Sequence, residues 1–349
     1  MTNPITQTIG CDLGDKWSTV FVLEGNGTTG RRARVRTTPD AIGQFFQRPP
    51  VHVVIEVGAH SRWVSSQLRE LGHQVTVANP RRVQLISASS SKSDDADCEL
   101  LARLGRADVK LLAPIQHRGR EAHADLEQLK ARDVLVQTRT KLVNHTRAVV
   151  KAFGARLPKT SSEAFVSKTR KQIPTELAPA LEPIYQAIEA VDEQIKVLDR
   201  GIDRTAKRYP DVDVLSQPHG VGTLTALAYL LTVEDKTRFK SSRMAGAFFG
   251  LRPKRDQSGA VDKQLHITKT GDPFVRRLLV NCANFIIGPF GKDSDLRRWG
   301  LELAKRGGKN ARRRAKVAIA RKLAVLLHRL WVTGEVYEPL RQTAVTTAS

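Results

Sequence analysis

Three aspartates stand within four positions of SKSDDADCELLARL (residues 91–104), just before an apolar pattern of helical period. If a helix starts there, Asp94 and Asp97 are three residues apart and share one face, whereas Asp95 points elsewhere. Aspartates at a helix start often act only as caps that interact favourably with the helix dipole. Two interpretations therefore stand side by side: a capping cluster, or ligands for a cation.

Two further carboxylates favour the cation site. Asp12 ends an apolar segment, TIGCDLGD, that predicts a strand, and Glu56 lies near the end of VHVVIEV, a run typical of a strand buried on both faces. A carboxylate there is costly unless it is paired or bound to a metal. Because neighbouring strand ends meet at one edge of a sheet, a helix laid on that edge would add Asp94 and Asp97. Two Mg²⁺ ions about 4 Å apart would neutralise these four ligands and clamp both oxygens of a phosphodiester exchange.

A second candidate site surrounds Ser258 in RDQSGA. A serine before glycine in a polar loop is most often a turn residue. A serine nucleophile needs a base or a metal, and His266 is expected to be an ordinary loop residue, so the acidic site would supply the activator. The neighbouring cations can hold a phosphate and stabilise a phosphoryl transition state. They are Arg252, Lys254, Arg255, Lys263, Lys269, Arg276 and Arg277.

The composition points to a polyanionic partner. Lys and Arg number 57 against 35 Asp and Glu, a net charge of +22, which favours nucleic acid over a basic protein without such a partner. A basic helix near the C-terminus adds a phosphate-binding surface. Its cations include Arg312, Arg313, Arg314, Lys316, Arg321 and Lys322. The segment PHGVGTLT (residues 218–225) resembles a helix-hairpin-helix phosphate grip, although a simple tight turn explains it equally well.

Other features concern the compartment. Three widely separated cysteines form neither a zinc motif nor a disulfide framework, which fits a reducing cytosol. The N-terminus lacks the pattern of a signal peptide, and no apolar run reaches membrane-spanning length. We therefore expect a cytoplasmic, nucleoid-associated protein without a membrane partner. Aromatic residues make up 5%, so base stacking should be minor.

Hydrophobic patterns predict the architecture. The first 80 residues predict three strands, a helix, a strand, a helix and another strand, and the helix at the aspartates follows. Residues 181–202 carry a heptad pattern that predicts a coiled coil, or equally a helix packed on its own domain. We expect an α/β domain over residues 1–115, a helical extension over 116–160, a coiled-coil arm over 161–210 and a mostly helical domain over 211–349. The heptad residues are Leu181, Ile184, Ile188, Val191, Ile195, Leu198 and Ile202.

The order of strands and acids resembles the RNase H-like nuclease fold. Six segments occur in order: GCDLGDK, VVIEVGAHS, SKSDDADCELLARL, PHGVGTLTALAYLL, FFGLRPKRDQSG and ITKTGDPFVRRLL. Together they resemble the DEDD-type transposases of the insertion-sequence one-ten family over nearly the whole chain. One departure is EVGAHSRW, where many relatives have EATG followed by an aromatic residue; Glu56 is kept, so only the neighbouring contacts are affected.

The resemblance implies a RuvC-like domain with an Asp-Glu-Asp-Asp metal site, a coiled-coil arm and a C-terminal transposase domain with a nucleophilic serine. It also implies recombination of donor and target DNA, guided by a structured bridge RNA, in a dimer or tetramer. Carried over, the acids are Asp12, Glu56, Asp94 and Asp97, with Mg²⁺ as cofactor, and the serine is Ser258. Two alternatives are a Holliday-junction-type endonuclease that uses the four acids and water, and a non-catalytic nucleic-acid-binding protein.

Overall fold

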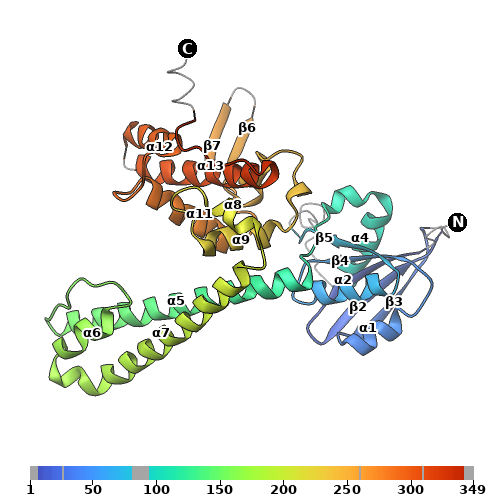
Figure 1. Ribbon diagram of the computed structural model, residues 1–349. Coiled ribbons are helices and arrows are strands. Elements are labelled where there is room, and N and C mark those ends of the chain that lie inside the picture. The colour runs from blue at the N-terminus through green and yellow to red at the C-terminus, as the bar shows by residue number, and fades with distance from the viewer. Residues whose placement is uncertain (1–6, 26, 81–93, 259–260, 309, 342–349) are drawn as a thin grey trace, which may run out of the picture. The chain divides into compact units, whose positions relative to one another are not determined.

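The computed structural model describes residues 7–25, 27–80, 94–258, 261–308 and 310–341 (Figure 1). For Asp94 and residues 261–264 the description is limited to the backbone. The chain divides into two compact units, residues 1–117 and 118–349, which are treated separately below. Within the described residues, no helix combines the length and the apolarity needed to cross a membrane.

The N-terminal unit is built on a five-stranded mixed sheet in the order β3-β2-β1-β4-β5. Strands β1 (Thr8–Leu13), β2 (Trp17–Leu23) and β3 (Gly30–Arg36) form an antiparallel meander. Strands β4 (His52–Glu56) and β5 (Gln74–Ala78) extend the sheet from β1 in parallel. The strand and helix order expected from the sequence is therefore confirmed.

Helices cover both faces of this sheet. On one face, α1 (Pro39–Phe45) and α2 (Ser61–Glu70) pack in one cluster with alternate residues of β1 and β4, among them Ile9. On the other face, α4 (Asp94–Ala107) packs with the remaining alternate residues, among them Val54. A strand enclosed from both sides is apolar at consecutive positions, which explains the run of Val53, Val54 and Ile55 in β4. The short 3₁₀ helix Val109–Leu112 follows α4.

A long helical hairpin forms the arm of the C-terminal unit. Helices α5 (Arg120–Ala152) and α7 (Ala178–Ala206) lie antiparallel side by side, and their connection contains α6 (Phe165–Thr169) and two 3₁₀ turns (Figure 1). Arg139 on α5 lies 2.7 Å from Asp192 on α7. The heptad of α7 thus has its packing partner in the same chain.

The burial of the heptad residues supports this packing. Phe165 and Tyr185 stack at the tip, with ring centroids 5.8 Å apart, inside a cluster that also includes Val143 and Val150 of α5. The structure therefore agrees with the second of the two interpretations, a helix packed on its own domain. Oligomerisation through this arm stays a prediction. Leu181, Ile188, Ile195 and Ile202 are buried, whereas Ile184, Val191 and Leu198 are half-buried.

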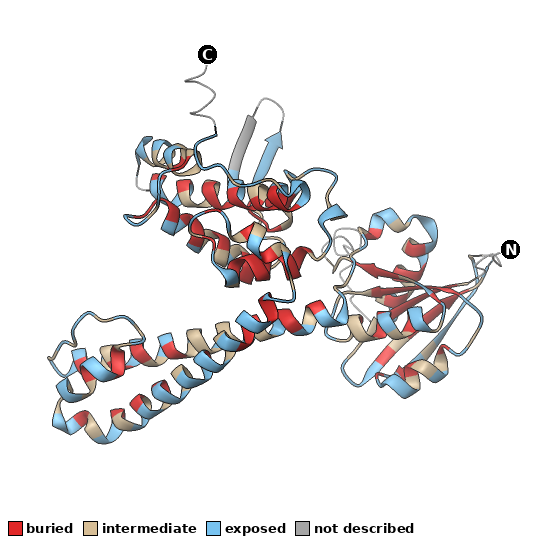
Figure 2. Ribbon diagram, in the orientation of Figure 1, coloured by how far each residue is buried: buried red, intermediate tan, exposed pale blue. Residues whose placement is uncertain are grey.

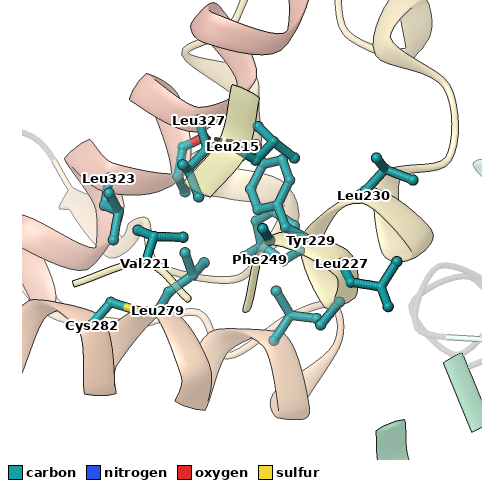
Figure 3. Packing of buried hydrophobic residues seen from close by; sticks show 14 of the residues in the cluster. Leu215, Val221, Leu227, Tyr229, Leu230, Phe249, Leu279, Cys282, Leu323 and Leu327 are labelled. Carbon is teal, nitrogen blue, oxygen red and sulfur yellow. Dashed lines mark hydrogen bonds between the residues drawn. The ribbon is translucent and has the colours of Figure 1, made fainter. Parts of the chain in front are cut away.

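The rest of the C-terminal unit is a helical domain around one large core. Helix α9 is buried from Thr225 to Val233, and α11 and α13 pack on it (Figures 2 and 3). The hydroxyl of Tyr229 donates to the carbonyl oxygen of Ala324 at 2.7 Å, so the one buried phenol on α9 has a partner. The helices are α8 (Asp211–Ser216), α9 (Thr223–Val233), α10 (Met244–Phe248), α11 (Pro273–Ile286), α12 (Asp295–Lys305) and α13 (Ala311–Thr333), with a 3₁₀ turn at Lys236–Arg238.

One expectation about this domain is wrong. The basic segment around Ser258 and His266 was expected to be a loop, but it forms a hairpin of β6 (Pro253–Ser258) and β7 (Val261–Ile267). Every residue of β6 after Pro253 is exposed. Strand β6 is therefore held by backbone pairing rather than by burial, and it lacks the apolar alternation that reveals most strands in a sequence.

Candidate active site

Asp12 and Glu56 lie at equivalent positions of neighbouring parallel strands. The register of β1 and β4 pairs Gly10 with Val54 and Cys11 with Ile55, so the next pair in register is Asp12 and Glu56. Because side chains alternate along a strand, both acids point to the same face as Gly10 and Val54. That face is the one covered by α4. This register is compatible with the expected convergence of the two acids, which stays a prediction.

The direction of α4 follows from its contacts with β1. A Cβ atom built on Gly10 would lie 1.9 Å from the carbonyl oxygen of Cys98, so the helix backbone touches the strand there. Near the other end of the helix, the guanidinium of Arg106 donates to the carbonyl oxygens of Glu24 and Gly25, which follow β2. Residue 23 of β2 pairs with residue 8, the first of β1. The helix therefore runs opposite to β1, and its N-terminus is directed toward the strand end that carries Asp12.

This direction brings the aspartates of α4 toward the strand acids. Asp97 is half-buried and Asp95 is exposed, in agreement with the expectation that these two point to different sides of the helix. The side chain of Asp94 lies outside the described residues, although its backbone is the first residue of α4. Among the side chains that the structure describes, no group of three or more acids, histidines or cysteines is close enough to hold a metal ion. Assembly of the four acids stays a prediction.

The thiols of Cys11 and Cys98 lie close enough to the acids for the carboxylate charges to change their pKa values. The pKa of the Cys98 thiol is raised to about 11, mainly by burial and in part by the charges of Asp95 and Asp12. Burial also raises the pKa of Cys11 above its usual value, with Asp12 adding to the effect. Both thiols are therefore neutral at physiological pH and act as small packing residues. The influence of Asp12 on Cys98 places its charge near the first turns of α4.

The loops that follow β1 and β4 add polar groups that sequence reasoning missed. His60 Nε2 lies 3.9 Å from Asp15 Oδ1, and Trp63 Nε1 donates to His60 Nδ1 at 3.0 Å. The hydroxyl of Ser61 lies 3.0 Å from His117 Nε2. Of these residues, His60, Ser61 and Trp63 belong to the segment EVGAHSRW, where the sequence departs from the family pattern. Their spacing in the sequence matches no metal or catalytic motif, and only the fold brings them together.

Ser258 is the last residue of β6 and is exposed. It pairs with Val261 across the hairpin, while Gly259 and Ala260 between them lie outside the described residues. No base among the described side chains forms a hydrogen bond with its hydroxyl. The structure thus presents Ser258 at the end of a narrow, solvent-exposed hairpin.

The predicted basic residues fall into two groups. Arg276 donates to the carbonyl oxygens of Phe249 and Thr270, and Arg277 pairs with Asp133 at 2.5 Å, so both are engaged within the protein. Others are exposed on the hairpin, in the residues that flank it, or on the first turns of α13. These exposed residues are Arg252, Lys254, Arg255, Lys269, Arg312, Arg313 and Arg314, while Lys316 is half-buried and the side chain of Lys263 lies outside the described residues.

The segment at residues 218–225 forms a turn before α9. Gly220 has a φ of +98°, and the amide of Val221 donates to the carbonyl oxygen of Pro218 at 3.0 Å. The N-cap of α9 is Gly222, which has no side chain to cap the first amides. A pocket of about 420 Å³ adjoins this turn and is bordered by Phe285. Both interpretations, a phosphate grip and a tight turn, stay open.

Two segments of the chain match models of transposase families. Residues 9–154 match a family model described as a transposase with a DEDD domain of the IS110 type. Residues 212–295 match a model described as the transposase IS116/IS110/IS902 family. The two matches together contain the four acids and Ser258.

Relatives that match along most of the chain are also named as transposases. The transposase for insertion sequence element IS1328 of Yersinia enterocolitica is 29% identical over 80% of this chain and 84% of the relative. The transposase for IS1111A of Coxiella burnetii is 27% identical over 82% and 79%, respectively. A "probable family 20 transposase" of Pseudomonas aeruginosa is 26% identical over 88% and 90%. By these matches, the chain belongs to the IS110-family DEDD transposases.

Proposed function

We propose that this transposase cleaves, exchanges and rejoins DNA strands of an insertion sequence, with a structured bridge RNA that selects the sites. The acidic residues of the N-terminal unit and Ser258 of the C-terminal unit are the reacting groups in this proposal. The net charge of +22 supports it, because both DNA and RNA must be held. The family implies a DNA-processing enzyme that uses divalent metal.

The observation that carries the proposal is the pairing of Asp12 and Glu56 in one register and on one face. Two carboxylates side by side at the ends of buried strands repel each other, and a cation is the usual means of keeping both ionised. Helix α4 points its N-terminus toward the same edge. A capping role explains aspartates at the start of α4 but does not explain the two acids on the strands.

Divalent cations fit this donor set by its chemistry, because carboxylate oxygens are the ligands that Mg²⁺ prefers. Asp12 and Glu56 would hold the cation from the sheet, and Asp94 and Asp97 from α4. When bound, the cation would supply Lewis-acid stabilisation of charge on the phosphoryl oxygens. We include two cations in the proposal, because a pair would stabilise the charge on both the attacking and the leaving oxygen.

In the proposed reaction, the Oγ atom of Ser258 attacks a DNA phosphorus and a phosphoserine ester replaces one phosphodiester bond. The proton of the serine passes to a base, and the displaced deoxyribose oxygen leaves as a hydroxyl. Because one ester is exchanged for another, the reverse attack by a deoxyribose hydroxyl rejoins the strand without ATP. The exposed end of a narrow hairpin suits such a nucleophile, which must reach a phosphate in a bulky duplex.

A suicide DNA substrate that traps the covalent intermediate tests the serine. The wild type should yield a DNA adduct that peptide mapping assigns to Ser258, and Ser258→Ala should lose the adduct, cleavage and joining. Binding of RNA and DNA should persist, because one hydroxyl contributes little to a surface dominated by Lys and Arg. Gln257→Ala, the exposed neighbour on β6, is the matched control. Cleavage by Ser258→Ala at the wild-type rate would remove the serine from the mechanism.

Substitution of the acids tests the second half of the site. Asp12→Asn and Glu56→Gln keep the size of each side chain but remove its charge, so cleavage should be abolished while the fold persists. Asp95→Asn should have a mild effect, because Asp95 is exposed on another side of α4. Thermal unfolding of each variant checks the fold. Equal loss of cleavage in Asp95→Asn would mean that a different face of α4 serves the site.

A second candidate function is an endonuclease for branched DNA in which the acids activate water. This alternative is favoured because no base among the described side chains forms a hydrogen bond with the hydroxyl of Ser258. The adduct experiment separates the two, since a water nucleophile leaves no protein–DNA bond. A purely binding role is the third alternative, and it gives no reason for acids gathered at a strand end, because negative charge facing phosphate weakens binding.

The guide RNA has its own test. RNA that copurifies with the protein should contain one structured species that derives from the end of the mobile element. Sequencing this RNA would also identify donor and target sites, which the protein sequence does not encode if recognition depends on base pairing. A random sample of cellular RNA would contradict the guided mechanism but not the strand-transfer chemistry.

A further inference from the structure

A large groove lies on the C-terminal unit. Its volume is about 1540 Å³, and its walls come from α12, α13, the β7 side of the hairpin and the segment after α13. Figure 1 shows α12, α13 and the hairpin next to one another. Because Ser258 belongs to the same hairpin, the groove adjoins the element that carries the proposed nucleophile.

The cations that line this groove are only partly paired with acids: Arg329 and Arg341 both pair with Glu335, which also lines it. Elsewhere, many arginines have acid partners within the protein, for example Arg139 with Asp192 and Arg298 with Asp293. In the groove, six cations have no ion-pair partner among the described residues. An unpaired group of like charges is unfavourable unless a ligand of opposite charge is bound. The six residues are Arg243, Lys269, Arg313, Arg314, Arg321 and Lys322.

The groove also has an apolar floor. Half-buried side chains of α12 and α13 face it without a covering layer, and Trp299 lies among them. The ammonium of Lys322 lies 3.8 Å from the centre of the Trp299 ring, a cation–π contact that fixes a positive charge at the floor. The apolar residues are Leu296, Trp299, Leu303, Val317, Val325 and Leu326. A matching ligand must offer both negative charge and flat apolar surface.

The walls of the groove are held in place by backbone contacts. Lys269 has a φ of +53°, a left-handed conformation that costs a non-glycine residue stability, and its amide donates to the carbonyl oxygen of Gly250 at 3.1 Å. On the opposite side, the amide of Asp295 donates to Pro339 at 2.8 Å and the amide of Tyr337 to Gln217 at 2.7 Å. Strained backbone that surrounding contacts maintain is common at ligand sites.

We propose that this groove binds an unpaired, single-stranded stretch of nucleic acid, with its phosphates on the six cations and at least one base against the apolar floor. The proposal rests on the proposed function, which requires nucleic acid near the hairpin. A duplex fits the charges but not the floor, because its flat base faces are stacked inside and only base edges, sugars and phosphates are exposed. A single strand presents both surfaces at once.

Binding measured by fluorescence anisotropy tests this inference on the full chain. The probes are labelled oligonucleotides of about 12 nucleotides: a single strand, the matching duplex, and a strand of abasic sites. The single strand should bind at least about tenfold more tightly than the duplex and than the abasic strand, since one stacked base contributes roughly that factor or more. Lys322→Ala and Arg314→Ala should each weaken single-strand binding and lower the salt slope by about 0.7.

The matched control is Lys305→Ala. Lys305 is an exposed lysine on α12 that pairs with Glu302 and does not line the groove, so its loss should leave single-strand binding unchanged. Trp299→Leu keeps an apolar floor but removes the ring, and it should weaken the single strand more than the abasic strand. Thermal unfolding identifies any variant that fails to fold.

The outcomes separate this inference from the proposed function. Equal affinity of the wild type for duplex, abasic and normal strands would overturn the single-strand groove but leave a DNA-processing enzyme intact. Full single-strand binding by both Lys322→Ala and Arg314→Ala would also overturn it, since the site would then lie elsewhere. No binding to any nucleic acid would contradict the proposed function itself.

Discussion

The substitution Gly10→Ala should disable the acidic site without touching any acid. Gly10 lies two residues before Asp12 on β1 and faces α4. Its new Cβ atom would lie 1.9 Å from the carbonyl oxygen of Cys98 and 2.6 Å from the amide nitrogen of Ala102. Both are backbone atoms of a helix, so neither can rotate away. The helix must retreat by about 1 Å before the closer contact becomes tolerable.

The size of the effect follows from that displacement. Forcing one methyl group into a packed interface typically costs about 1–3 kcal/mol, which a domain of this size should survive. A displacement of about 1 Å in a catalytic group reduces rates by roughly 10²-fold. We therefore expect Gly10→Ala to fold with a modestly lower free energy of unfolding and to lose about two orders of magnitude in strand cleavage.

The assay combines cleavage of a labelled DNA substrate in Mg²⁺ with urea unfolding of the same preparations. Gly58→Ala is the matched control, because Gly58 follows β4 close to Glu56 and a Cβ there meets no atom within 4 Å. A Gly10→Ala protein with wild-type stability and cleavage would refute the close contact between α4 and β1. Loss of stability with normal cleavage would mean that α4 contributes no ligand to the site.

Two further predictions concern the C-terminal unit. Ile188→Ala should lower the free energy of unfolding, measured in urea, by about 2–5 kcal/mol, since Ile188 is fully buried between the arm helices. Val197→Ala, at an exposed position of α7, is the control. Burial lowers the pKa of His328 below its usual value of 6.5 in the folded protein. The stability that the neutral imidazole contributes is therefore complete above pH 6.5 and is lost as the pH falls through the folded pKa. In His328→Gln, the urea midpoint should fall less than in the wild type between about pH 7 and pH 5. An equally steep pH dependence in His328→Gln would assign the titration to another group.

The N-terminal unit was predictable because its strands obey simple rules. The run VHVVIEV has no polar residue between Val53 and Ile55, as a doubly covered strand requires, and Gly25–Gly27 marks the turn between two antiparallel strands. The face and register of Asp12 and Glu56 follow from the same alternation. What the sequence did not reveal is how closely α4 approaches β1. A glycine within a strand is the available sign of close approach, and Gly10 occupies such a position.

Three features of the C-terminal unit could not be predicted from sequence patterns: the packing partner of α7, the β6–β7 hairpin and the groove. A heptad specifies an apolar stripe but not its partner, so the stripe on α7 was compatible with another chain as well as with α5. The hairpin was missed for a different reason. Residues of β6 are charged or polar on both faces and exposed, so no alternation distinguishes them from a loop. The groove was invisible in the sequence because its cations come from separate segments that only the fold assembles.

The charge pattern of α4 bears on the two interpretations of its aspartates. Glu99 on this helix binds both nearby arginines, Arg32 at 3.0 Å and Arg103 at 2.9 Å, and these contacts lower the pKa of Glu99 below its usual value. Asp97 makes no ion pair with any described residue, although it is the more deeply placed of the two described aspartates in the first turn. A chain rich in arginine could have neutralised Asp97 directly. The arginines beside α4 pair with Glu99 instead, and this arrangement supports the proposed cation site, because a capping role alone does not require Asp97 to lack such a partner.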